Sequence, residues 1–237
     1  RGGLVRRRRI RRRFAAVLIG LALAAACGRE PAAPATPAGS PIPAAAQAVS
    51  RTKVVFLGDS LTAGYGLSAA ESYPSLLGQR LRSRGLDADV VNAGVSGDTS
   101  AGGLRRLDWA LDGDVRVLVV ALGGNDALRG LSTDALRGNL AAIIERARKR
   151  NVTVVLAGME APPNLGRAYT SAFRQVYRDL AAQHRVELIP FLLEGVAGRP
   201  ALNQADLIHP NAEGAARVAD LVWPYVERAV REAGRDD

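Results

Sequence analysis

A serine, a histidine and an aspartate, far apart in the chain, have the types and local settings of a nucleophilic site. Ser60 stands in Gly58-Asp59-Ser60-Leu61 directly after a short apolar run, where the glycine allows a sharp turn. His209 follows Asp206 by three residues, so the carboxylate can reach one ring nitrogen and leave the other for Ser60. This pattern predicts Ser60 as nucleophile, His209 as general base and Asp206 as the acid that orients the imidazole.

Two further segments offer hydrogen-bond donors for a developing oxyanion. Gly94 lies in Asn92-Ala93-Gly94-Val95-Ser96-Gly97, and Asn125 lies in Gly123-Gly124-Asn125-Asp126. We expect the backbone N–H groups of Ser60 and Gly94, with the side-chain amide of Asn125, to form the oxyanion hole. Each segment taken alone is also typical of an ordinary turn, and Asp59 is expected to support its turn instead of acting as a second acid.

The remaining histidine and the cysteine limit the chemistry. His184 ends a helical pattern beside Arg185 and is expected at the surface or as a helix cap. Cys27 is the only cysteine, so an internal disulfide and a thiolate metal site are excluded. The expected reaction therefore needs neither a metal nor another cofactor.

Alternating strand and helix patterns position these residues. Short apolar runs predict five strands, at 53–57, 89–92, 115–122, 152–157 and 186–189. Helical spacing is found at 73–84, 99–111, 133–149, 168–183 and 211–232, the last with a kink at Pro224. This alternation predicts an α/β fold with a parallel sheet covered on both faces, whose sites lie at the carboxyl ends of the strands.

The first 27 residues are typical of a bacterial export signal. A basic stretch at 6–13 precedes an apolar run at 14–26, which ends in three alanines before Cys27. This favours a lipoprotein signal with lipidation of Cys27; a plain secretory signal and a retained membrane anchor are the alternatives. Residues 28–50 are a Pro/Ala-rich linker, 51–233 the folded domain and 234–237 a short tail.

The net charge of +9 belongs to the export signal and not to the domain. Eight of the 32 basic residues fall within the first 13 positions, and 24 basic residues face 23 acidic ones after Cys27. A basic groove for nucleic acid is therefore not supported. Only a small-molecule substrate and, through a lipid anchor, a membrane are expected as partners.

These motifs, taken in chain order, resemble the GDSL/SGNH hydrolase family over about Val54 to Val230. The namesake serine, glycine, asparagine and histidine match Ser60, Gly94, Asn125 and His209. The segments resemble in particular the bacterial acyl-CoA thioesterase I, lysophospholipase and arylesterase subgroup. The resemblance implies a flavodoxin-like three-layer fold with a five-stranded parallel sheet. It also implies an exported, periplasmic or envelope enzyme that cleaves esters or thioesters.

Three other functions are alternatives to this one. A carbohydrate or peptidoglycan O-acetyl esterase would use the same site but should carry more aromatic residues than the 5% found. A non-catalytic surface-binding lipoprotein should lack a triad or oxyanion residue. A nucleotide or flavin binder would need a glycine-rich phosphate loop after the first strand. The loops at 127–131 and 159–169 are expected to shape an acyl pocket.

Overall fold

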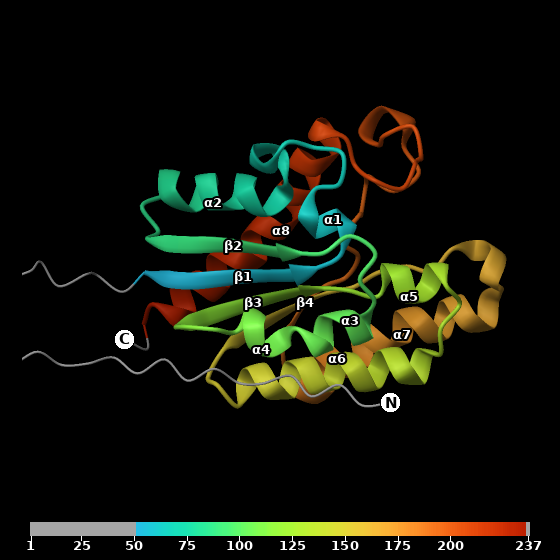
Figure 1. Ribbon diagram of the computed structural model, residues 1–237, viewed down its shortest axis with the longest axis horizontal. Coiled ribbons are helices and arrows are strands. Elements are labelled where there is room, and N and C mark those ends of the chain that lie inside the picture. Colours follow the sequence, from blue (N-terminus) through green and yellow to red (C-terminus); the bar gives the residue numbers. More distant parts are fainter. Residues whose placement is uncertain (1–50, 236–237) are drawn as a thin grey trace, which may run out of the picture. The chain divides into compact units, whose positions relative to one another are not determined.

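The computed structural model describes residues 51–235; the predicted export signal, Cys27 and the linker lie outside this range. Five parallel strands form one sheet in the order β2-β1-β3-β4-β5 (Figure 1). They are β1 (Thr52–Gly58), β2 (Ala88–Gly94), β3 (Val115–Ala121), β4 (Thr153–Ala157) and β5 (Glu187–Ile189). Each strand overlaps a predicted apolar run, so the predicted five-stranded parallel sheet is confirmed.

Helices cover both faces of the sheet, which confirms the predicted three layers (Figure 1). One face carries α2 (Tyr73–Ser83) and α8 (Ala212–Ala233). The other carries α3 (Ser100–Arg105), α4 (Leu107–Ala110), α6 (Thr133–Arg148) and α7 (Arg167–His184). The shorter elements are α1 (Ser60–Ala63), α5 (Gly124–Leu128) and the 3-10 turns η1 (Ala69–Glu71), η2 (Pro163–Leu165) and η3 (Pro200–Leu202).

The core lies on both sides of the central strands. Val54 to Leu57 in β1 and Val117 to Val120 in β3 are fully buried, which explains their continuous apolar runs. The edge strand β2 is less buried: Asp89 and Asn92 are exposed, and Val90 and Val91 are only partly buried. The buried central strands fix the positions of their carboxyl ends, and therefore also the starting points of the loops that follow them.

Two local predictions differ from the structure. The segment at 99–111 is not one helix, because Arg106 adopts φ −101° and ψ 9° and separates α3 from α4. His184 is not at the surface: it is the last residue of α7 and only 9% exposed. It lies four residues after the buried Leu180, so it continues the apolar stripe of α7, and this helical spacing explains its burial.

The last helix is long and amphipathic. α8 runs as one helix from Ala212 to Ala233 with Pro224 inside it, and it packs against α2 and four of the strands. Arg80 of α2 forms an ion pair with Asp220 and lies over the ring of Trp223 at 4.5 Å. Within residues 51–235, no helix has the length and apolar character needed to cross a membrane.

Candidate active site

Ser60 is the first residue of α1, two residues after the end of β1. The buried Asp59 caps this helix, because its Oδ1 accepts a hydrogen bond from the Leu61 N–H at 3.0 Å. A Cβ atom on Gly58 would lie 2.0 Å from Thr62 Oγ1, so glycine is needed for α1 to fold back over the strand end. The turn thus holds Ser60 at the carboxyl edge of the sheet, and Asp59 supports it as expected.

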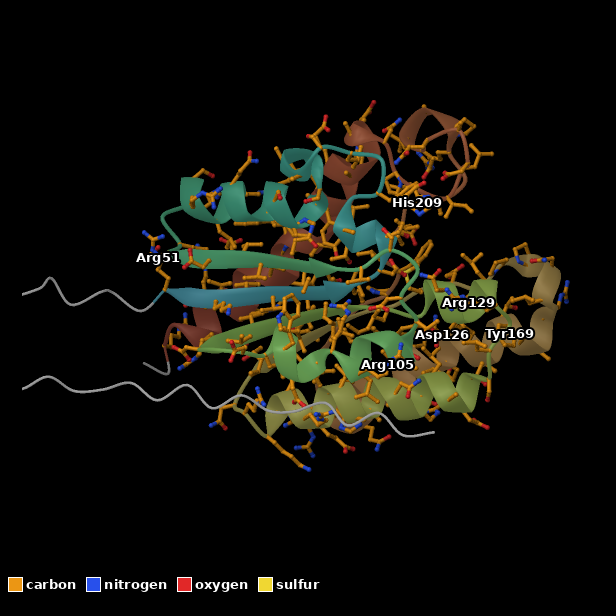
Figure 2. All side chains as sticks on the ribbon, viewed as in Figure 1. Arg51, Arg105, Asp126, Arg129, Tyr169 and His209 are labelled. Carbon is orange, nitrogen blue, oxygen red and sulfur yellow. The ribbon has the colours of Figure 1, made fainter. Side chains whose placement is uncertain are left out.

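His209 lies in the loop between η3 and α8, beyond the carboxyl ends of the strands (Figure 2). Asp206 Oδ1 accepts hydrogen bonds from the N–H groups of Ile208 and His209, both at 3.0 Å. Asp206 Oδ2 lies 2.7 Å from His209 Nδ1, and His209 Nε2 lies 2.9 Å from Ser60 Oγ. The structure therefore brings the three predicted residues together in the order that proton transfer requires.

The electrostatics of this loop favour one state of the imidazole. The N–H of His209, its ring and the N–H of Ile208 hold the pKa of Asp206 down at about 2. The carboxylate is therefore ionised throughout the neutral range. An anion beside Nδ1 favours the tautomer with a proton on Nδ1, which leaves Nε2 as the acceptor facing Ser60.

Gln204 fixes the histidine loop in a way that the sequence did not indicate. Its Nε2 donates to the carbonyls of Tyr65 at 2.7 Å and Pro210 at 3.0 Å. Its backbone N–H donates to the carbonyl of His209 at 2.8 Å. Gln204 thus ties the loop of His209 to the segment that follows α1, and the Tyr65 ring packs 4.7 Å from the imidazole. A glutamine in an irregular loop carries no sequence signal for such a role.

Asn125 enters the same cleft from α5, directly after β3. Its Nδ2 donates to the carbonyl of Asp98 at 2.9 Å and lies 3.4 Å from Asp59 Oδ2. Together with Ser60 it lines the largest apolar cleft at this end of the described domain. The Asp98 carbonyl holds one of the two amide protons, and the longer contact with Asp59 leaves the second proton as the one that can turn to a ligand in the cleft.

Gly94 is placed differently from the prediction. Its N–H already donates to Asn92 Oδ1 at 3.0 Å, and a Cβ there would lie 2.2 Å from the backbone nitrogen of Ala63. Gly94 therefore packs against α1, and it does not line the cleft. Gly97 does line the cleft, with φ 83°, and its N–H makes no hydrogen bond within residues 51–235. Gly97, and not Gly94, is therefore placed to offer an N–H group to a ligand in the cleft.

A buried carboxylate next to Asn125 fixes α5 to two other helices. Asp126 is 2% exposed and accepts hydrogen bonds from the N–H of Ser100 at 2.7 Å and from its hydroxyl at 2.5 Å. Asn139 of α6 donates to the same hydroxyl at 2.9 Å. The sequence did not indicate this network, because its members come from three separate elements.

The cleft beside Ser60 has a volume of about 610 Å³, within the usual size range for small-molecule sites. Both predicted loops contribute to it, and a third segment that was not predicted, around residues 191–198, completes its wall. Its apolar lining includes Leu128, Met159, Ala161, Pro162, Pro163, Phe191, Leu193, Leu207 and Ile208. Among residues 51–235, no group of three or more His, Cys, Asp or Glu side chains is arranged to hold a metal ion.

The chain was compared with known proteins. Residues 56–217 match the model of the GDSL-like lipase/acylhydrolase family. The chain is 46% identical over 182 residues to esterase TesA of Pseudomonas aeruginosa strain PAO1, covering 76% of this chain and 90% of that protein. It is 39% identical over 185 residues to thioesterase 1/protease 1/lysophospholipase L1 of Escherichia coli K12, covering 78% and 88%.

A solved structure gives the same result. The crystal structure of AlinE4, described as an SGNH-hydrolase family esterase, superimposes with a TM-score of 0.64 at 45% identity. It covers 76% of this chain and 97% of the other. From the family match and these identities it follows that the chain belongs to the GDSL-like lipase/acylhydrolase family.

Proposed function

We propose that this chain is an exported serine hydrolase that cleaves carboxylic esters or thioesters through an acyl-enzyme on Ser60. The observation that carries the proposal is the continuous contact from Ser60 Oγ to His209 Nε2 and from His209 Nδ1 to Asp206. Membership of the family and the names of the relatives, an esterase and a thioesterase, support the reaction class.

The first half-reaction forms the acyl-enzyme. His209 Nε2 takes the hydroxyl proton as Ser60 Oγ attacks the acyl carbonyl carbon, and ionised Asp206 stabilises the imidazolium. When the tetrahedral intermediate collapses, His209 returns the proton to the departing alcohol or thiol. Water then attacks the acyl-enzyme, again with His209 as base, and releases the carboxylic acid.

Three donors are assigned to the oxyanion: the N–H groups of Ser60 and Gly97 and the amide of Asn125. All three residues line the same cleft. Donors of this kind act when negative charge develops on the carbonyl oxygen, so they lower the barrier without tightening ground-state binding equally.

The lining of the cleft points to an acyl or aryl group as the part of the substrate that is recognised. Its walls are mainly aliphatic, and Glu160 at the cleft is paired with Arg174 at 3.0 Å. Acetylated sugars would leave most of this apolar surface unused. We therefore expect turnover to rise when short acyl chains are lengthened.

The test combines covalent labelling with turnover. A fluorophosphonate should react with Ser60 Oγ, with loss of fluoride, and give one adduct on the peptide that contains Ser60. Ser60→Ala should lose the label and about 10⁴-fold or more of its activity on p-nitrophenyl esters. Ser96→Ala, a second serine of the cleft, is the matched control and should keep the label on Ser60. A folded Ser60→Ala protein with normal turnover would refute the proposal.

We also propose that Cys27 is the lipidated first residue of the mature protein, held to the membrane by its acyl chains. The basic stretch, the short apolar run and the small residues before Cys27 support this. The proposed envelope location follows from the same segment.

A further inference from the structure

Arg106 places a cation beneath the carboxyl ends of β1 and β2. It separates α3 from α4, and its side chain is only 18% exposed. Nη2 donates to the carbonyl of Gly58 at 2.8 Å, and Nη1 donates to the carbonyl of Ala93 at 2.6 Å. Nε donates to Asp98 Oδ2 at 2.6 Å. One guanidinium thus joins the end of β1 to the end of β2 and to the loop that follows β2.

Each of these three segments leads directly to the proposed site. Gly58 lies two residues before Ser60, and the Ala93 carbonyl lies where β2 gives way to the loop of Gly97. Asp98 follows Gly97, and its backbone carbonyl is the acceptor that fixes the amide of Asn125 at 2.9 Å. Arg106 does not itself line the cleft.

The surroundings of Asp98 show that this contact is built into the fold. Asp98 is 16% exposed, and a Cβ atom on Gly102 would lie 2.2 Å from its Oδ1. Glycine at the start of α3 is therefore what allows the carboxylate to reach Arg106. The Gly58 carbonyl also accepts the Val95 N–H at 3.0 Å, so the same atom joins β1 to the loop of Gly97.

We infer that Arg106 is a positioning residue for the oxyanion hole, holding Ser60, Gly97 and the acceptor of Asn125 in one fixed geometry. This inference rests on the proposed function. A planar guanidinium supplies several donors in fixed directions, which the single ammonium of lysine does not. Because a displacement of about 1 Å at such donors can cost roughly 10²-fold in rate, the effect should appear in turnover.

Arg106→Lys tests this geometry while keeping the charge opposite Asp98. We expect kcat to fall by about 10²-fold with KM changed less than about 3-fold, because the substrate cleft is not lined by Arg106. Arg137→Lys is the matched control, since Arg137 pairs with Asp179 between α6 and α7, away from the cleft. It should keep wild-type kcat. Rates are measured on protein shown to be folded by circular dichroism, and wild-type kcat in folded Arg106→Lys would overturn the inference.

A double-mutant cycle separates positioning from a general structural effect. Because Arg106 holds the acceptor of Asn125 as well as Ser60 and Gly97, Arg106→Lys combined with Asn125→Ala should lose clearly less kcat than the product of the two single losses. Fully multiplicative losses would overturn the inference. If Arg106→Lys does not fold, Asp98→Asn is tested instead. This substitution keeps the shape of the side chain at 98 but removes its charge. The weaker hydrogen bond from Arg106 should lower kcat about 5- to 10-fold. Unchanged kcat in folded Asp98→Asn would count against the role.

Failure of the proposed function and failure of the role of Arg106 give different results. An active, folded Ser60→Ala protein removes the proposed function and this inference with it. An inactive Ser60→Ala protein together with wild-type kcat in Arg106→Lys removes only the role of Arg106.

Discussion

Asn125 presents a neutral amide to the cleft, and its two neighbours, the Asp98 carbonyl and Asp59, are both acceptors. This arrangement fixes which end of the amide carries the protons. Asn125→Ala should lower kcat by roughly 10²–10³-fold with a smaller change in KM, because the amide acts most strongly on developing charge. Steady-state kinetics on a p-nitrophenyl ester measure both constants. A rise in KM alone would make Asn125 a substrate-binding residue instead.

Asp59 provides a test through pH. Its burial raises its pKa from 3.8 to about 6, so the folded state holds a proton more tightly than the unfolded chain does. The free energy of unfolding should therefore fall by about 3 kcal/mol as pH rises from about 4 to 6, counting this group alone. In Asp59→Asn that contribution is absent. Urea unfolding of both proteins at several pH values gives the difference, and parallel curves would contradict the raised pKa.

At the scale of elements, Gly94 and Gly97 differ in how much stability a Gly→Ala substitution should cost. A Cβ atom at Gly94 would meet the backbone of Ala63 at 2.2 Å, so Gly94→Ala must push α1 away from β2. We expect a loss of stability above about 3 kcal/mol, seen as a lower midpoint in urea. At Gly97 the nearest atom is the end of Arg129 at 3.9 Å, so Gly97→Ala should cost only about 1–2 kcal/mol for its positive φ. Normal stability in Gly94→Ala would show that the contact can relax.

The elements themselves were largely predictable, because the central strands are buried on both faces and read as apolar runs. The break between α3 and α4 was not predictable. It lies at Arg106, whose side chain donates to the carbonyls of Gly58 and Ala93, and these partners are distant in sequence. Gly94 was misjudged for a related reason: a glycine after a strand can serve close packing or a ligand, and only the position of α1 decides.

The contact among Ser60, His209 and Asp206 was predictable because each of these residues follows a strand or lies in a short local motif. Asp206 and His209 are three residues apart, so their contact is local. Gln204, Arg106 and the network of Asp126 were missed because their partners are distant in sequence. Polar side chains that form hydrogen bonds with residues distant in sequence show no periodic pattern from which they could be predicted.

At the scale of the whole molecule, the excess of positive charge lies before Cys27, and the rest of the chain is nearly neutral. Such a domain has little electrostatic attraction to anionic lipid, so membrane attachment should depend on acylation. Cys27→Ser should therefore move the protein from the membrane fraction to the soluble or precursor pool. Fractionation followed by mass spectrometry of the N-terminus measures this. Soluble wild-type protein with an unmodified N-terminus would exclude the lipid anchor. As a control, the specific activity of the domain should be the same in Cys27→Ser and in the wild type.

Helix α8 also sets the order of events during folding. It covers one face of β1, β3, β4 and β5, yet it is synthesised after all of them. Until residues 212–233 have left the ribosome, that face of the sheet is covered only by α2, over β2, and the core is incomplete. We therefore expect a nascent chain to stay incompletely folded until α8 has been synthesised, and a translocation channel can thread such a chain. Completion of the hydrophobic core thus waits for α8, the last helix of the domain to be synthesised.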